Sequence, residues 1–194
     1  MTTASTWHMP AETEKQARTW MAWPVADYGT PAEEARRAWS AVANAITQHG
    51  GQPVTMLVTA EEEPYARKLL DDEVTLLVTR LDDGWARDTG PTFVVDAQRT
   101  RLGAVDWVFN AWGAQSWASW AWDARVATTI AEEVGAEIIP SEMVAEGGGF
   151  HTDGHPGRRP AAVRAGRRRP LHHPAGAGHQ LGAPAQSPES GGRR

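Results

Sequence analysis

Two short stretches of the sequence combine the residue types that proton transfer and cation binding require. They are "DDGWARDTGP" at residues 82–91 and "EGGGFHTDG" at residues 146–154. In the second, His151 and Asp153 are two residues apart, so their side chains share one face if the segment is extended. A carboxylate beside a histidine stabilises the protonated imidazole and orients it for proton transfer. A surface strand with a polar face would show the same spacing, and the pattern leaves both interpretations open.

The first stretch favours the binding of a planar cation. Trp85 offers an aromatic face for stacking, and Asp88 offers two carboxylate oxygens for paired hydrogen bonds. The alternative is structural: Asp88 and Thr89 would only satisfy backbone amides of a turn that ends at Gly90 and Pro91.

Other candidate residues point more weakly to chemistry. Most of the ten tryptophans are expected in the core, such as Trp39 on a helix face; Trp112 could line a site, although core packing is favoured. Cysteine is absent from the sequence, which excludes disulfides, thiolate metal ligands and a cysteine nucleophile within these residues. Four histidines near the C-terminus could suggest a metal, but no packed structure is expected around them, and we predict none: His155, His172, His173 and His179.

The elements that would position these residues alternate between strands and helices. Thr30 and Pro31 mark the start of the clearest helix, which glycines end at residues 50–51. A helix, a glycine and a strand recur at Gly135, which favours repeated β/α units and an α/β fold. We predict strands at residues 18–24, 53–59, 74–79, 92–96, 101–109 and 137–140, helices at 30–50, 62–70 and 122–134, and irregular structure at 80–91 and 110–120.

Charge and composition limit the class of protein. Of 19 basic and 24 acidic residues, eight arginines but only one acid, Glu189, fall in residues 155–194. The preceding part is therefore strongly acidic, which suits a small cationic substrate better than nucleic acid. No stretch suggests a signal peptide or a membrane helix, so we expect a soluble, cytoplasmic protein.

Six motifs in order resemble the agmatine deiminases, which are related to the Porphyromonas-type peptidylarginine deiminases. They are "MPAE", "TWMAWP", "DDGWARDTGPTFVVD", "FNAWG", "WDARVA" and "EGGGFHTDG". The match has small departures: Phe150 stands where isoleucine is more usual, and the tryptophan that usually follows "MPAE" is absent. The resemblance implies a five-fold pseudo-symmetric α/β propeller (pentein) with a central acidic site, of which this chain would form part.

The resemblance also implies roles for individual residues. Asp88 and Asp153 would bind the guanidinium, and His151 would protonate the departing ammonia and later activate water. Glu146 and Trp85 would line the pocket. The family's cysteine nucleophile has no counterpart here, so we expect no activity from this polypeptide alone. No metal or organic cofactor is implied; agmatine is the expected substrate, and a homo-oligomer remains one possible state.

The pattern changes sharply after residue 154. Residues 1–154 are expected to form the N-terminal part of a deiminase domain. Residues 155–194 contain six prolines and seven glycines with few large apolar side chains, which predicts disorder. We interpret them as a frameshifted tail, which resequencing the codons for residues 154–157 would test.

Three alternative functions remain open. They are a peptidylarginine deiminase, a non-catalytic polyamine or guanidinium binder, and, least favoured, a nucleic-acid binder that uses the arginine-rich tail.

Overall fold

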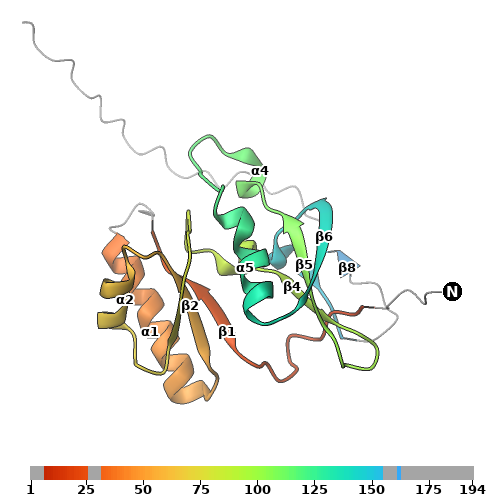
Figure 1. The fold of residues 1–194 in the computed structure, drawn as a ribbon, viewed down its shortest axis with the longest axis horizontal. Helices are drawn as coiled ribbons and strands as arrows, with labels where there is room; N and C mark the ends of the chain where they lie inside the picture. The colour runs from red at the N-terminus through yellow and green to blue at the C-terminus, as the bar shows by residue number, and fades with distance from the viewer. Residues whose placement is uncertain (1–6, 26–31, 155–160, 163–194) are drawn as a thin grey trace, which may run out of the picture. The chain divides into compact units, whose positions relative to one another are not determined.

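The computed structural model of the protein describes residues 7–25, 32–154 and 161–162 (Figure 1). The predicted helix cap at Thr30 and Pro31 lies outside these residues. So does the predicted tail, apart from Ala161–Ala162, which form the short strand β8. None of the helices in the described residues is long and apolar enough to cross a membrane.

The first half of the described chain forms a parallel sheet with the order β1-β2-β3. The strands are β1 (Thr19–Ala22), β2 (Val54–Val58) and β3 (Thr75–Val78). Parallel neighbours need a crossover connection, which α1 (Ala32–Gly50) and α2 (Glu63–Leu69) supply, as the sequence predicts. All three strands end at one edge of this sheet, where ligands commonly bind in open α/β sheets.

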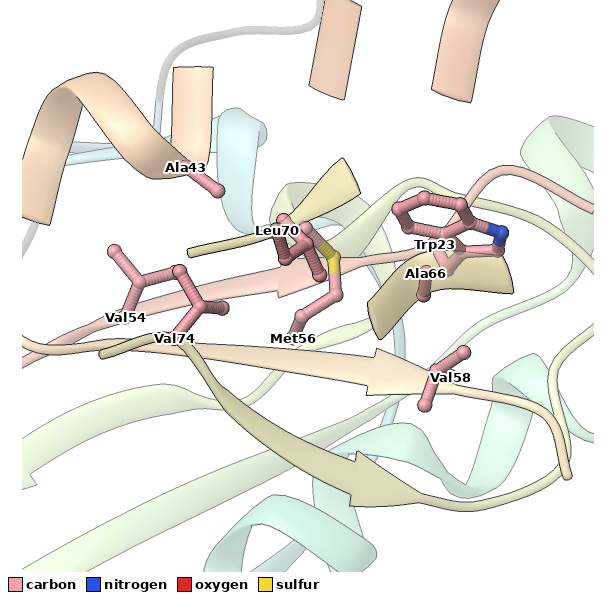
Figure 2. Close-up of a cluster of buried hydrophobic side chains, with 8 residues drawn as sticks. All are labelled: Trp23, Ala43, Val54, Met56, Val58, Ala66, Leu70 and Val74. Atoms are coloured by element: carbon pink, nitrogen blue, oxygen red, sulfur yellow. The ribbon is translucent and has the colours of Figure 1, made fainter. Parts of the chain in front are cut away.

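A hydrophobic core fills the space between this sheet and its two helices (Figure 2). Every residue of β2 is buried, which is typical of a central strand covered on both faces. One face of β2 packs with residues of α1, α2 and the segments beside β1 and β3. Eight buried residues form this first cluster: Trp23, Ala43, Val54, Met56, Val58, Ala66, Leu70 and Val74.

The second half forms a mixed sheet with the order β4-β5-β6. A tight turn joins β4 (Thr92–Val95) to the antiparallel β5 (Leu102–Val108). β6 (Glu137–Val144) pairs with β5 in parallel, after the crossover helix α5 (Val126–Glu133). The predicted strand at residues 137–140 therefore extends four residues further than the sequence indicates.

A second buried cluster joins the first sheet to helix α5. Leu57 packs with Ala22, Leu81, Val126 and Ile130, and all five side chains are buried. Because Leu57 alternates with Met56 and Val58 along β2, it lies on the opposite face of the sheet from the first cluster.

The repeated glycines mark helix ends, as predicted. Gly51 has φ +58° and Gly135 has φ +65°, in the left-handed region that ends helices without steric cost to glycine. Each is followed by a strand that pairs in parallel with the strand before its helix. The predicted β/α units are thereby confirmed within the described residues.

Two segments predicted as irregular contain short ordered turns. Within residues 80–91, Ala86–Thr89 form the one-turn helix α3. Within residues 110–120, Ala111–Ala114 form a turn, α4, in which Ala111, Trp112 and Ala114 all have positive φ. Neither turn has enough residues for a periodic signal, and both depend on contacts elsewhere in the fold.

Candidate active site

Helix α3 places Asp88 one turn after Trp85. The carbonyl of Trp85 accepts hydrogen bonds from the backbone N–H groups of Asp88 (2.9 Å) and Thr89 (3.0 Å). The Thr89 hydroxyl donates to the same carbonyl at 3.1 Å. Trp85 and Asp88 are therefore held together by one turn of backbone, as cation stacking and pairing would require.

The Trp85 indole contacts two other tryptophans, and we call these three rings the aromatic cluster. Its ring centroid is 6.1 Å from that of Trp39 and 6.4 Å from that of Trp112, both in edge-to-face geometry. Trp39 was predicted as core packing, but it is only half-buried, and its indole N–H donates to the Gly84 carbonyl at 3.4 Å. Trp85 as a whole residue remains 36% exposed, so its contacts with Trp39 and Trp112 do not bury it completely.

Trp112 connects the aromatic cluster to the carboxylate. Its indole N–H donates to Oδ2 of Asp88 at 3.3 Å, and its ring packs edge-to-face against Phe109 at 5.3 Å. The backbone of Trp112 has φ +57°, a conformation that costs a non-glycine residue roughly 1–2 kcal/mol. The Asn110 side chain stabilises the turn by accepting from the Gly113 N–H at 2.9 Å. Strained backbone of this kind concentrates at functional sites.

Two aspartates far apart in sequence fix the loop before α3. Oδ1 of Asp123 accepts from the backbone N–H groups of Asp82 (2.8 Å) and Asp83 (3.2 Å). In return, Oδ2 of Asp82 accepts from the N–H groups of Trp122 (2.7 Å) and Asp123 (3.2 Å). We call this reciprocal pair the aspartate clasp; it ties the loop at residues 82–85 to the 3-10 turn Asp123–Arg125 that precedes α5.

Asp123 is the titratable group in the clasp with the most perturbed environment. Its side chain is almost fully buried, with 1% exposed. Burial raises the pKa of Asp123 to about 6, and the nearby charges of Asp82 and Asp83 act in the same direction, against the backbone N–H groups that stabilise the carboxylate.

The glycine-rich segment after β6 packs directly against α3. A β-carbon on Gly147 would lie 2.6 Å from the Arg87 carbonyl oxygen, and one on Gly148 would lie 3.8 Å from Oδ1 of Asp88. Glu146, just before them, is half-buried and extended, and its carbonyl accepts from the Gly149 N–H at 2.8 Å. The structure thus brings the backbone that follows Glu146 to the carboxylate of Asp88.

His151 and Asp153 follow on an anchored but exposed segment. Only Phe150–His151 form a strand, β7, which is shorter than the predicted extended run to Asp153. The Phe150 ring stacks on Trp107 at 4.6 Å, and both His151 and Asp153 are exposed. Their placement opposite Asp88 stays a prediction.

The N-terminal "MPAE" motif contacts the segment that contains His151 and Asp153. The Thr152 hydroxyl donates to the Met9 carbonyl at 3.4 Å. Gly154 has φ +75°, and a β-carbon there would lie 2.7 Å from the backbone nitrogen of Ala11. The first and last of the six sequence motifs therefore meet in the fold.

Some residues of the site were not predicted from the sequence. Asp123 precedes a helical pattern, so an N-terminal cap was the signal available, but its carboxylate instead accepts from a loop 41 residues away. Within residues 7–25 and 32–154, no group of three or more His, Asp or Glu side chains is arranged to hold a metal ion.

This combination of an α/β fold with a carboxylate hydrogen-bonded to a tryptophan of an aromatic cluster suits a protein that binds cations. Comparison with known proteins is more specific. A sequence profile of the Porphyromonas-type peptidyl-arginine deiminase family matches residues 8–157. The chain therefore belongs to this family.

Individual relatives carry agmatine deiminase names. A Streptomyces coelicolor protein, provisionally named an agmatine deiminase, is 48% identical over 153 residues, which cover 77% of this chain and 44% of that protein. The agmatine deiminase of Ectopseudomonas mendocina is 41% identical over 158 residues, which cover 78% of this chain and 42% of that enzyme.

A solved structure extends the similarity to the fold. The agmatine deiminase of Enterococcus faecalis, solved while catalysing its reaction, superposes with a TM-score of 0.69 at 33% identity, covering 80% of this chain and 44% of the enzyme. The chain spans less than half the length of each of these relatives.

Proposed function

We propose that this chain carries the guanidinium-binding part of an agmatine deiminase. The reaction would convert agmatine and water to N-carbamoylputrescine and ammonia. The described residues would form part of a five-fold pseudo-symmetric α/β propeller. The ordered series of six motifs and the names of the relatives support this proposal.

The observation that carries the proposal is the environment of Asp88. Its carboxylate accepts from Trp112, lies one turn from the Trp85 ring, and faces the backbone of Gly148. A fixed carboxylate beside an aromatic face matches a guanidinium, which is planar and presents hydrogen-bond donors along its edges. Asp153 would supply the second carboxylate of the pair.

His151 and Glu146 would complete the site. In the proposed reaction, a thiolate attacks the guanidinium carbon, and His151 gives a proton to the departing ammonia. Water, deprotonated by His151, then attacks the same carbon and releases the thiolate and the ureido product. Glu146 would line the pocket beside the substrate.

The printed sequence contains no cysteine, so the 194-residue polypeptide cannot itself supply the thiolate. Serine and threonine ionise too little near neutral pH to replace it. We therefore expect the isolated polypeptide to bind agmatine without turning it over, which is also the behaviour of the non-catalytic binder considered as an alternative.

Calorimetric titration of the purified polypeptide with agmatine tests the proposal. We expect saturable binding that D88N weakens at least about tenfold, because a neutral amide loses the charge-assisted hydrogen bonds to the cation. D72N removes an exposed aspartate elsewhere and should leave the affinity unchanged. An absence of agmatine binding, or equal binding by D88N, would contradict the proposal.

Two further measurements separate the alternatives. Titration with a peptide that contains arginine gives an affinity to compare with that for agmatine. Tighter binding of the peptide would indicate a peptidylarginine site, and tighter binding of agmatine would indicate an agmatine site. Ammonia release above that of an H151A variant would show that the polypeptide turns agmatine over, contrary to our expectation.

A further inference from the structure

The Asp83 carboxylate accepts hydrogen bonds both from the backbone of its own loop and from the side chain of Trp85 in the candidate site. Its Oδ1 accepts from the Gly84 backbone N–H at 2.7 Å, and its Oδ2 accepts from the Trp85 indole N–H at 2.7 Å. Both bonds join a charged acceptor to a neutral donor at short distance, the geometry of the stronger class of hydrogen bonds. The Trp85 indole is thereby tied at its nitrogen to the residue two positions before it.

The aspartate clasp fixes the position from which Asp83 acts. The backbone N–H of Asp83 donates to the buried carboxylate of Asp123 at 3.2 Å. The neighbouring Asp82 makes four hydrogen bonds, one through its backbone N–H and three through its carboxylate. The Asp83 carboxylate therefore projects from a backbone that is pinned to the start of the helical segment at residues 123–133.

The Trp85 ring that carries this bond also contacts two other tryptophans. With its nitrogen held by Asp83, the indole meets Trp39 and Trp112 edge-to-face, at interplanar angles of 78° and 86°. An indole can rotate about two side-chain bonds. Without the bond to Asp83, binding of a cation to the ring face would also have to restrict these rotations, which costs binding free energy.

We infer that Asp83, braced by the Asp82–Asp123 clasp, is a positioning residue that fixes the Trp85 indole for the cation. This inference rests on the proposed function for its ligand. Asp83 acts through the Trp85 N–H and not through direct contact with the cation.

Indole resonances of tryptophan labelled with ¹⁵N test the positioning step without any ligand. The chain has ten tryptophans, and the resonance missing from a W85F variant identifies Trp85. In D83A we expect this resonance to move and its N–H to exchange with solvent about tenfold faster, because the protecting hydrogen bond is lost. D83N keeps one acceptor oxygen and should give an intermediate result, while D72N should give the wild-type spectrum.

Agmatine titration of a double-mutant cycle tests the consequence for binding. D83A should weaken agmatine binding about tenfold in the wild-type background. In a W85F background the same substitution should change the affinity less than about twofold, because the N–H through which Asp83 acts is already absent.

The outcomes separate this inference from the proposed function. Equal losses from D83A in both backgrounds would overturn it, because Asp83 would then act by its charge alone; an unchanged Trp85 resonance in D83A would overturn it as well. If the wild-type chain fails to bind agmatine, the proposed function falls, and the Trp85 resonance still decides whether Asp83 positions the ring. Should D83A fail to fold, D83N serves in both measurements.

Discussion

Two aspartates near the same loop have opposite environments. Asp88 is half-buried, and a tryptophan N–H donates to it. Asp123 is buried beside Asp82 and accepts from two backbone N–H groups. The sequence indicates a cation-binding role for the first because Trp85 lies three residues before it in the chain, and it leaves a purely structural role in a turn as the alternative. It does not predict the second, because its partners are distant in sequence and meet it only in the fold.

The raised pKa of Asp123 should make stability depend on pH. In the folded state its pKa is about 6, above its ordinary value near 4 when unfolded. Between pH 4 and 6 the folded protein therefore holds a proton that the unfolded chain has released, so this group's contribution to stability falls as pH rises. The loss is complete above pH 6 and amounts to roughly 2–3 kcal/mol.

D123N should remove this pH-dependent loss, because an amide does not ionise and its oxygen can still accept from Asp82 and Asp83. We expect the free energy of unfolding of D123N minus that of wild type to increase as pH rises from 4 to 7, because only wild type loses stability over this range. Urea unfolding at several pH values measures this difference, and taking the difference cancels the contributions of carboxylates that do not interact with Asp123. Parallel curves for the two proteins would show that Asp123 does not carry the effect; D72N, which changes an exposed residue, should give such parallel curves.

Among the elements, length determines what the sequence could predict. The helix α1 has nineteen residues and a clear apolar period, and four of the five residues of the buried strand β2 are apolar. The C-terminal end of α1 and both ends of β2 lie within about two residues of the predicted positions. Helix α3 and the turn α4 have four residues each, too few to form alone. Contacts between Trp112, Asp88 and the glycines after Glu146 support them in the fold. The sequence shows these residues only as three separate motifs.

The close contact between Gly147 and α3 allows a test of whether the glycine segment and this helix support each other. In G147A the new methyl group would lie 2.6 Å from the Arg87 carbonyl oxygen, well inside contact distance, and a backbone oxygen cannot move aside as a flexible side chain can. We expect G147A to lose about 1–3 kcal/mol of stability. It should also weaken agmatine binding, since α3 carries Asp88.

G149A is the matched control for G147A. A β-carbon on Gly149 meets nothing within 4 Å, so its stability should stay within about 1 kcal/mol of wild type. Urea unfolding and agmatine titration compare the two variants. Equal behaviour of G147A and G149A would mean that the close approach to Arg87 does not hold the glycine segment in place.

At the scale of the whole molecule, two buried clusters lie on opposite faces of one strand. Met56 belongs to the cluster with α1 and α2, and Leu57 belongs to the cluster with α5. The order of strands and helices predicts α/β units but not which units share a core. The joining of α5 to the first sheet through Leu57 is therefore known from the structure alone, and it determines whether the two sheets unfold together.

Substitution of these neighbouring residues tests the coupling between the two sheets. Met56 and Leu57 are both 0% exposed, so M56A and L57A should each lower the free energy of unfolding by about 2–5 kcal/mol. If the described sheets form one cooperative unit, each variant should unfold in a single transition whose denaturant dependence equals that of wild type, because the surface exposed on unfolding is unchanged. A loss for M56A with almost none for L57A, or a second transition in L57A alone, would mean that α5 and the mixed sheet unfold independently of the first sheet. In that case the Asp82–Asp123 clasp would join two separately folding parts, and agmatine would stabilise both only if its site includes residues from each.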